Sequence, residues 1–164
     1  VAATSWVMKI PGEAVSKGVE AFHGAGRRME FKGTYHGAQV YDDYAHHPDE
    51  LRATLEAIRS MGDHRLVLAF QPHTYTRTKL LMDDFIRELK KADVVVLAEI
   101  YAARESNTIG ISSADLAAQI PGSIYCETLQ DVTETLRKIV KEGDIVVTMG
   151  AGDIFRAGEA LLAE

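Results

Sequence analysis

One short segment of this sequence concentrates side chains that could bind a ligand or move a proton. Two carboxylates, a phenol and two imidazoles stand between an apolar, strand-like run and the start of a predicted helix. These residues are Asp42, Asp43, Tyr44, His46 and His47. In an open α/β sheet such a strand-to-helix turn lies at the carboxyl edge, where ligands bind. The alternative is structural, because Asp and His also cap turns and helices.

The chemistry of this first cluster depends on which group meets a ligand. A carboxylate at a strand end can accept two hydrogen bonds from a ribose diol, and Asp43 is the candidate for that contact. It could instead cap the helix through backbone amides. His46 and His47 suit hydrogen bonding to a carboxylate ligand near a helix start. A metal site would need further ligands at coordinating distance, and we predict no metal here.

A second cluster runs from Gln71 to Thr78, again between a buried strand and a helix. It is therefore expected at the same sheet edge as the first cluster. Its Arg77 carries a planar guanidinium that suits bidentate pairing with a carboxylate or a phosphate. The neighbouring His73 and Tyr75 favour that role over an ordinary surface arginine.

Three weaker signals are expected at the same edge. Arg27 and Arg28 follow a glycine-containing linker and could clamp a phosphate, stack on a base or stand as a solvated pair. A strand, glycine turn and helix at the end of the chain would receive an anion, and a loop after another strand could line the pocket. The glycine turn contains Gly150, Gly152 and Asp153, and the loop contains Tyr101, Arg104 and Glu105. The sequence contains no G-x-x-x-x-G-K-[ST] phosphate-binding loop, so ATP use through such a loop needs another segment.

Alternating strands and helices must position these clusters. Continuous apolar runs predict buried strands, and apolar residues three and four apart predict a buried helix face. Strands are expected over 30–37, 38–44, 65–70, 93–97, 123–125 and 144–149. Helices are expected over 1–22 with a break at Pro11, from Pro48, over 78–91 and 113–120, from Thr128 and after Asp153. The sequence therefore predicts an α/β fold: a doubly wound, mostly parallel sheet with an antiparallel edge.

Composition excludes several classes of protein. The chain has 164 residues and a net charge of −6, which argues against a nucleic-acid-binding face. A single cysteine, Cys126, allows no internal disulfide and favours a reducing, cytoplasmic setting. No apolar run approaches the ~20 residues of a membrane span, and no signal peptide is visible, so we expect no membrane partner. Because the chain starts at Val1 within a predicted helix, we expect a fragment of a longer protein.

Taken together, the motifs resemble the C-terminal domain of the Mur ligases. The segments that carry the resemblance are Phe22-x-Gly24-x-x-Arg27-Arg28-x-Glu30, Asp42-Asp43-Tyr44-Ala45-His46-His47-Pro48, Phe70-Gln71-Pro72-His73-x-Tyr75-x-Arg77-Thr78, Ile100-Tyr101-x-Ala103-x-Glu105 and Gly150-Ala151-Gly152-Asp153-Ile154. The match spans about residue 22 to the end of the chain. The motifs are specific in combination, whereas each one alone is not.

The resemblance implies a Rossmann-like domain of a three-domain cytoplasmic enzyme of peptidoglycan synthesis. The closest resemblance is to the member that joins L-alanine to the lactyl carboxylate of UDP-N-acetylmuramic acid. ATP with Mg²⁺ would be bound mainly by a preceding central domain, and the carboxylate would be phosphorylated before the amine attacks it. Residues 1–24 would then be the last helices and linker of that central domain, and residues 25–164 the C-terminal domain. The fragment alone is expected to be inactive.

The resemblance also implies roles for single residues. Arg28 and Asp43 match positions that contact the nucleotide. The amino-acid substrate is expected to be held by Tyr44, His46, His73 and Arg77. His46 is also a candidate general base. Where this sequence has Thr74, some members carry a second arginine, so His73 or a backbone amide would have to replace that contact with the substrate carboxylate.

Three other functions stay open. The domain could belong to the family member that recycles an intact tripeptide. The chain could be a non-catalytic α/β ligand-binding module, which a phosphate-binding loop encoded upstream of Val1 would rule out. A metal-dependent hydrolase could use the aspartates and histidines of the first cluster, and it would retain a tightly bound divalent ion.

Overall fold

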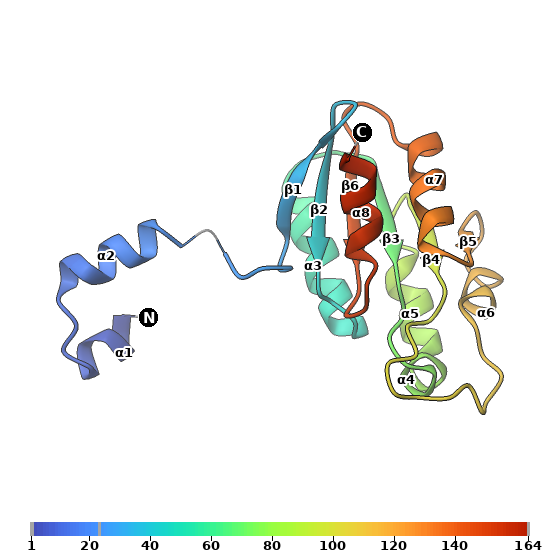
Figure 1. Ribbon diagram of the computed structural model, residues 1–164, viewed down its shortest axis with the longest axis horizontal. Coiled ribbons are helices and arrows are strands. Elements are labelled where there is room, and N and C mark those ends of the chain that lie inside the picture. Colours follow the sequence, from blue (N-terminus) through green and yellow to red (C-terminus); the bar gives the residue numbers. More distant parts are fainter. Residues whose placement is uncertain (1, 23, 164) are drawn as a thin grey trace.

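Six strands form one sheet, in the order β1-β2-β6-β3-β4-β5 (Figure 1). The computed structural model describes residues 2–22 and 24–163. The strands are β1 (Glu30–Tyr35), β2 (Ala38–Asp43), β3 (Leu66–Phe70), β4 (Val94–Ala98), β5 (Ile124–Cys126) and β6 (Ile145–Met149). Every neighbouring pair is parallel except β1 and β2, which form an antiparallel hairpin at one edge. The predicted mostly parallel sheet with an antiparallel edge is confirmed.

Burial explains the composition of the central strands. Every residue of β3 and β6 is buried. A strand that is covered on both faces needs apolar side chains on both, so it reads as a continuous apolar run rather than as an alternation. Parallel strands that lie side by side also collect their carboxyl ends at one edge, which is the lower edge of the sheet in Figure 1.

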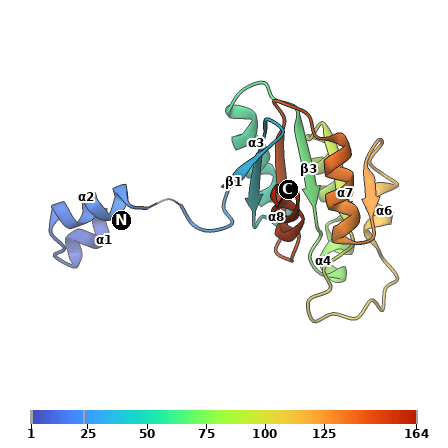
Figure 2. The same ribbon diagram turned by 45° about the horizontal axis from the view of Figure 1, so that its top comes forward.

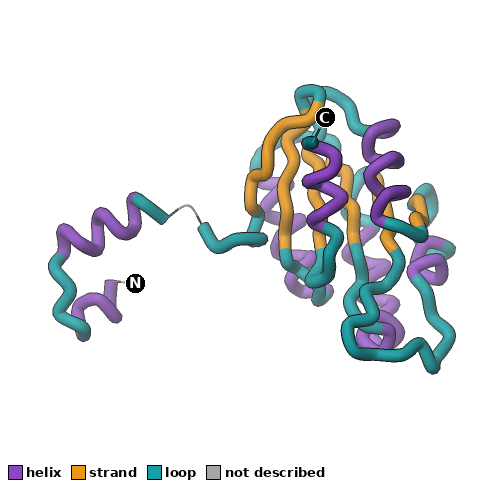
Figure 3. The backbone as a smooth tube through the Cα atoms, in the orientation of Figure 1, coloured by secondary structure: helices purple, strands orange, loops and turns teal. Residues whose placement is uncertain are grey.

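Helices cover both faces of the sheet and give the domain three layers (Figures 2 and 3). Their bounds are α3 (Pro48–Ser60), α4 (Tyr75–Leu80), α5 (Met82–Leu89), α6 (Ser113–Ala117), α7 (Leu129–Ile139) and α8 (Phe155–Leu162). Leu51 of α3 and Phe85 of α5 belong to the core on one face, together with Phe70 of the sheet. Leu136 of α7 and Leu161 of α8 belong to the core on the other face.

Local signals decide where the helices begin. Pro48 occupies the first position of α3, where its missing N–H is not needed. His47 caps α3: its Nδ1 accepts a backbone amide of the first turn at 3.3 Å, and the Glu50 carboxylate accepts the His47 amide at 3.2 Å. The alternative that an aspartate of the first cluster caps this helix is therefore wrong. α7 begins with the predicted capping box of Thr128 and Asp131.

The predicted helix over 78–91 is wrong in its bounds. Two helices, α4 and α5, stand there, and Leu81 between them departs from helical geometry with φ −108° and ψ 22°. α4 begins at Tyr75 because Thr74 turns the chain directly into it. Arg77 is thus a residue of the first turn of α4, rather than of a loop before the helix.

Two short helices precede the sheet, α1 (Ala2–Val7) and α2 (Gly12–Glu20), and they confirm the predicted break at Pro11. Figures 1 and 2 show them apart from the sheet. An apolar hollow lies between them, lined by residues that include Ile10 and Val15. Across the described ranges, no helix is both long enough and apolar enough to cross a membrane.

Candidate functional site

Ring side chains from three strand ends form a row along the carboxyl edge. Tyr44 and His46 follow β2, His73 follows β3, and Tyr101 follows β4. The ring centroids are separated in turn by 5.5, 5.8 and 5.6 Å, and the last pair is stacked with an interplanar angle of 22°. The backbones of His73 and Tyr101 also pair as an isolated parallel bridge. The two clusters that the sequence predicts at one edge therefore lie together.

Arg27 is a structural residue of this edge. Its Nε donates to Asp42 at 2.7 Å, and its terminal nitrogens donate to the carbonyls of Gly150 at 2.7 Å and Gly152 at 3.1 Å. The guanidinium also lies 5.0 Å from the ring centroid of Tyr44. All three guanidinium nitrogens are engaged. Arg27 therefore ties the start of β1 to the loop after β6, and the expectation that it clamps a phosphate is wrong.

Asp43 is also held from within the domain. One carboxylate oxygen accepts the amide of Met29 and the other accepts the amide of Ala45, both at 2.8 Å. The residue is only 3% exposed. These bonds stabilise the turn that presents Tyr44 to the edge. The contact between Asp43 and a ribose stays a prediction, and it would use the lone pairs that the two backbone bonds leave.

His46 is oriented by the first turn of α3. Its Nδ1 lies 3.0 Å from the carbonyl oxygen of Tyr44 and 3.4 Å from the carboxylate of Glu50. Burial disfavours ionisation of Glu50, but bonds from the His46 and His47 amides outweigh it and lower the pKa of that carboxyl. An ionised Glu50 beside Nδ1 fixes the imidazole and leaves its other nitrogen for hydrogen bonding or proton transfer.

Two buried nitrogens at this edge have no hydrogen-bond partner within the described part of the chain. They are Nδ1 of His73 and one terminal nitrogen of Arg77. Burial, the Arg77 charge and His46 lower the pKa of His73, so its imidazole is neutral at neutral pH. A buried polar group without a partner is costly unless a ligand or a water meets it. With its proton on Nδ1, His73 would present a donor beside Arg77, and two such donors suit an acceptor such as a carboxylate.

The turn into α4 has a conformation that side chains seldom adopt. Thr74 has φ 67° and ψ 143°, which is strained for a β-branched residue. Its amide donates to the carbonyl of Tyr101 at 2.9 Å. Glu105 accepts the amide of Thr76 at 2.9 Å and also its hydroxyl. These two bonds lower the pKa of Glu105, and they bring the loop after β4 against the helix start.

The loop after β6 requires glycine at two positions. Gly150 has φ 150°, and a Cβ there would stand 2.7 Å from the carbonyl oxygen of Gln71. A Cβ on Gly152 would collide with the Gln71 side chain and stand 2.7 Å from the ring of Tyr101. Gln71 donates to Asp153 at 3.0 Å. Gln71, Tyr101 and Asp153 line a hollow of about 260 Å³. That Tyr101 and Asp153 border the ligand pocket stays a prediction.

Arg28 is the exposed cation of the edge. Its guanidinium lies 5.7 Å from the ring centroid of Tyr44, the same ring that Arg27 contacts. Its charge also helps to lower the pKa of Glu50. A guanidinium that is accessible and backed by an aromatic ring suits an anionic group or a base.

Metal ligation receives no support from this geometry. The residues that the structure describes include no group of three or more His, Cys, Asp or Glu that could hold an ion. Asp42 is paired with Arg27, and each oxygen of Asp43 accepts one backbone amide. The described residues thus offer no such ligand group to a metal-dependent hydrolase.

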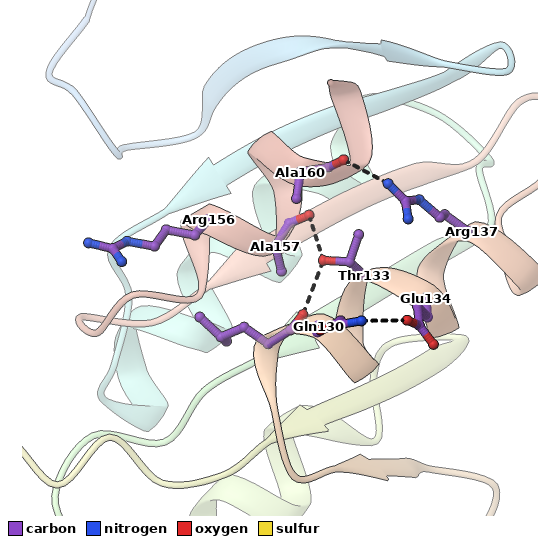
Figure 4. A pocket seen from close by; sticks show the side chains of 8 residues that line it. Gln130, Thr133, Glu134, Arg137, Arg156, Ala157 and Ala160 are labelled. Carbon is purple, nitrogen blue, oxygen red and sulfur yellow. Dashed lines mark hydrogen bonds between the residues drawn. The ribbon is translucent and has the colours of Figure 1, made fainter. Parts of the chain in front are cut away.

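A pocket of about 410 Å³ lies between α7 and α8 (Figure 4) and shares Leu129 with the hollow lined by Tyr101 and Asp153. Thr133 donates to the carbonyl of Ala157 at 3.4 Å, and Arg137 donates to that of Ala160 at 3.2 Å. These bonds tie the two helices together. None of the predicted site residues lines this pocket, which we assign to helix packing.

Two residues of the edge carry roles that the sequence does not reveal directly. Gln71 bridges the β3 end to the loop after β6, and Glu50 orients His46. The available signal for Gln71 is its place directly after a buried strand. The signal for Glu50 is its capping-box spacing from His47.

Known proteins share both the sequence and the fold. Residues 27–152 match the family described as Mur ligase, glutamate ligase domain. The chain is 48% identical over 159 residues to the UDP-N-acetylmuramate–L-alanine ligase of Lachnospira eligens. The match covers 94% of this chain and 35% of that protein. The chain thus spans about a third of the length of the curated relatives it matches.

Two solved structures show the same fold at lower identity. The UDP-N-acetylmuramate-alanine ligase of Thermotoga maritima aligns with a TM-score of 0.77 and 24% identity, over 98% of this chain and 34% of that one. A domain of a UDP-N-acetylmuramate:L-alanyl-γ-D-glutamyl-meso-diaminopimelate ligase from Haemophilus ducreyi aligns with a TM-score of 0.64 and 23% identity, over 82% of this chain and 97% of that one. With its family match over 27–152, the chain belongs to the Mur ligase family and carries its glutamate ligase domain.

Proposed function

We propose that this chain is the C-terminal domain of a cytoplasmic, ATP-dependent ligase that joins L-alanine to UDP-N-acetylmuramic acid in peptidoglycan synthesis. The name and 48% identity of a relative support the reaction. The chain's share of that relative, 35%, supports the assignment to one domain of a larger enzyme. Residues 1–24 would be the last part of the preceding central domain, and residues 25–164 would form the C-terminal domain, which acts together with it.

The observation that carries the amino-acid role is the pair of buried, unpartnered nitrogens on His73 and Arg77. The carboxylate of L-alanine would accept hydrogen bonds from Arg77, whose guanidinium offers paired donors in a fixed plane. Because Thr74 stands where some relatives of this family carry arginine, His73 would supply the neighbouring contact. Tyr44 and His46 lie next to His73 in the ring row and would border the substrate.

His46 is the proposed proton acceptor at this site. The amine of L-alanine must lose a proton as its nitrogen bonds to the activated carboxyl carbon and phosphate leaves. Glu50 holds Nδ1 of His46 at 3.4 Å, which leaves the other ring nitrogen to take that proton. The rest of the chain's contribution is to orient the amino acid and to supply fixed charge.

Arg28 and Asp43 are proposed to contact the nucleotide. ATP with Mg²⁺ supplies the phosphoryl group that activates the lactyl carboxylate. The accessible guanidinium of Arg28 over Tyr44 suits such an anion. Because the sequence contains no phosphate-binding loop, we assign most of the contacts with ATP and Mg²⁺ to the preceding domain.

Substitution of Arg77 by lysine in the intact ligase tests the proposal. Lysine keeps the charge but loses the planar fork, so kcat/KM for L-alanine should fall by a factor of roughly 30, about 2 kcal/mol. Arg52→Lys on α3 is the matched control, because Arg52 pairs only with surface carboxylates of its own helix. The same assay with an intact tripeptide in place of L-alanine tests the other family activity.

Two results would contradict the amino-acid role. One is an Arg77→Lys variant with lower melting temperature and normal L-alanine kinetics, which would make the residue structural. The other is a wild-type enzyme that joins the tripeptide but leaves L-alanine unused.

A further inference from the structure

The helix that carries Arg77 begins without a cap of its own. Thr74 occupies the N-cap position of α4, yet its side chain makes no capping hydrogen bond. Residues at that position normally use a side-chain oxygen to accept an amide of the first turn. Here the strained φ of 67° turns the Thr74 backbone toward Tyr101, whose carbonyl accepts the Thr74 amide at 2.9 Å.

Glu105 supplies the missing cap from another loop. Its carboxylate accepts the amide of Thr76 at 2.9 Å and the hydroxyl of the same residue. Thr76 is the second residue of α4, so its amide is one that a local N-cap would satisfy. A negative charge at this helix end is favourable, and the bonds from Thr76 keep the pKa of Glu105 low enough for it to be ionised at neutral pH.

The capped turn is the one that aims the two unpartnered nitrogens. Arg77 follows Thr76 directly, and His73 precedes the strained Thr74. His73 is held on its other side by the stacked ring of Tyr101, from the same loop as Glu105. Resting on the function proposed above, we propose that Glu105 is a positioning residue: it sets Arg77 and His73 for the amino-acid substrate without touching that substrate.

A direct contact between Glu105 and the substrate ammonium is the competing explanation, and glutamine separates the two. In Glu105→Gln the amide oxygen can still accept the Thr76 amide, while the NH₂ group can donate to the Thr76 hydroxyl. The cap therefore survives and the negative charge does not. Glu105→Ala removes both.

Steady-state kinetics of the intact ligase with L-alanine, ATP and UDP-N-acetylmuramic acid test the proposal. Glu105→Ala should raise the KM for L-alanine roughly tenfold, the loss expected for a helix cap, and should leave the KM for ATP within about twofold. Glu105→Gln should lie near the wild type. Glu56→Ala removes an exposed carboxylate of α3 whose nearest cation, Arg52, is 4.0 Å away, and it should change neither constant.

Three kinetic outcomes would overturn the proposal. Normal L-alanine kinetics in Glu105→Ala would show that the cap is dispensable. Equal impairment of the glutamine and alanine variants would show that the negative charge of Glu105, rather than its capping hydrogen bonds, is what the substrate requires. A parallel rise in the KM for L-alanine and the KM for ATP would mean that the substitution disrupts the whole carboxyl edge of the sheet.

Amide hydrogen exchange on the 164-residue chain gives a second test that needs no substrate. Glu105→Ala should speed exchange of the Thr76 and Thr78 amides at least tenfold, and Glu105→Gln should preserve their protection. Unchanged exchange in the alanine variant would overturn the capping role. A wild-type enzyme that does not use L-alanine would contradict the proposed function but not the capping role of Glu105, because the exchange measurement needs no substrate.

Discussion

Replacing Arg27 by methionine should destabilise the domain far more than its place at the surface suggests. The substitution removes the partner of Asp42, which is 2% exposed and keeps only the Thr148 hydroxyl, at 2.8 Å. Removing one member of a buried ion pair costs about 3–5 kcal/mol, because the other charge stays buried. Since the Arg27 side chain is itself 24% exposed, we expect the lower end, about 3 kcal/mol.

Arg59 offers an unusually close control for this measurement. It also pairs with one aspartate, Asp93 at 2.9 Å, and also donates to two backbone carbonyls. Its pair is exposed, however, at 39% for Arg59 and 44% for Asp93. Arg59→Met should therefore cost about 1 kcal/mol or less. Both variants lose one ion pair and two bonds to backbone carbonyls. They differ in burial and in the ring contacts that Arg27 makes with Tyr44 and Phe155.

Urea unfolding followed by far-UV circular dichroism measures both free energies. Fluorescence would be a poor probe, because the single tryptophan, Trp6, lies in α1 and is 81% exposed. A double cycle with Asp42→Asn should recover about 2 kcal/mol of coupling to Arg27. If Arg27→Met costs no more than Arg59→Met, or if the cycle shows no coupling, the argument from burial is refuted.

Two further predictions concern the second cluster. Thr74→Gly should stabilise the domain by about 1 kcal/mol, because relief of the strain at φ 67° outweighs the extra entropy of the unfolded chain. Thermal unfolding measures this change, and a lower melting temperature would contradict it. The lowered pKa of His73 means that the unfolded chain binds the proton more readily below the ordinary pKa of 6.5. The unfolding free energy should therefore be insensitive to this group above pH 6.5 and fall as the pH drops below it. Urea titrations at several pH values measure how steeply the unfolding free energy depends on pH, and His73→Gln should remove the part of that dependence due to His73. An unchanged pH dependence in the variant would count against the prediction.

Local sequence was sufficient wherever neighbouring residues decide the structure. Pro48 and the capping box at Thr128 mark helix starts through bonds within one turn, and the buried run over 66–70 reads as a strand because both faces are covered. The shared edge for His46 and His73 also follows, because parallel strands align their carboxyl ends.

Other features depended on partners far along the chain. Arg27 reads as a solvated arginine until β6 brings the Gly150 carbonyl to it. The early start of α4 depends on Thr74, and its cap comes from Glu105 in a different loop. The break at Leu81 has no Pro or Gly to announce it. Pairings at such separations leave no periodic trace in sequence.

The place of β6 in the sheet has a consequence for how the domain is made. β6 is the last strand of the chain, yet it lies between β2 and β3, which carry the two clusters. Until residues 145–149 have been synthesised, β2 and β3 have no strand to join them, and each presents an unpaired apolar edge. The β1-β2 hairpin and the β3-β4-β5 group can each pair earlier, but they join only through β6. The two clusters of the site therefore come together in one late, long-range step rather than growing with the chain.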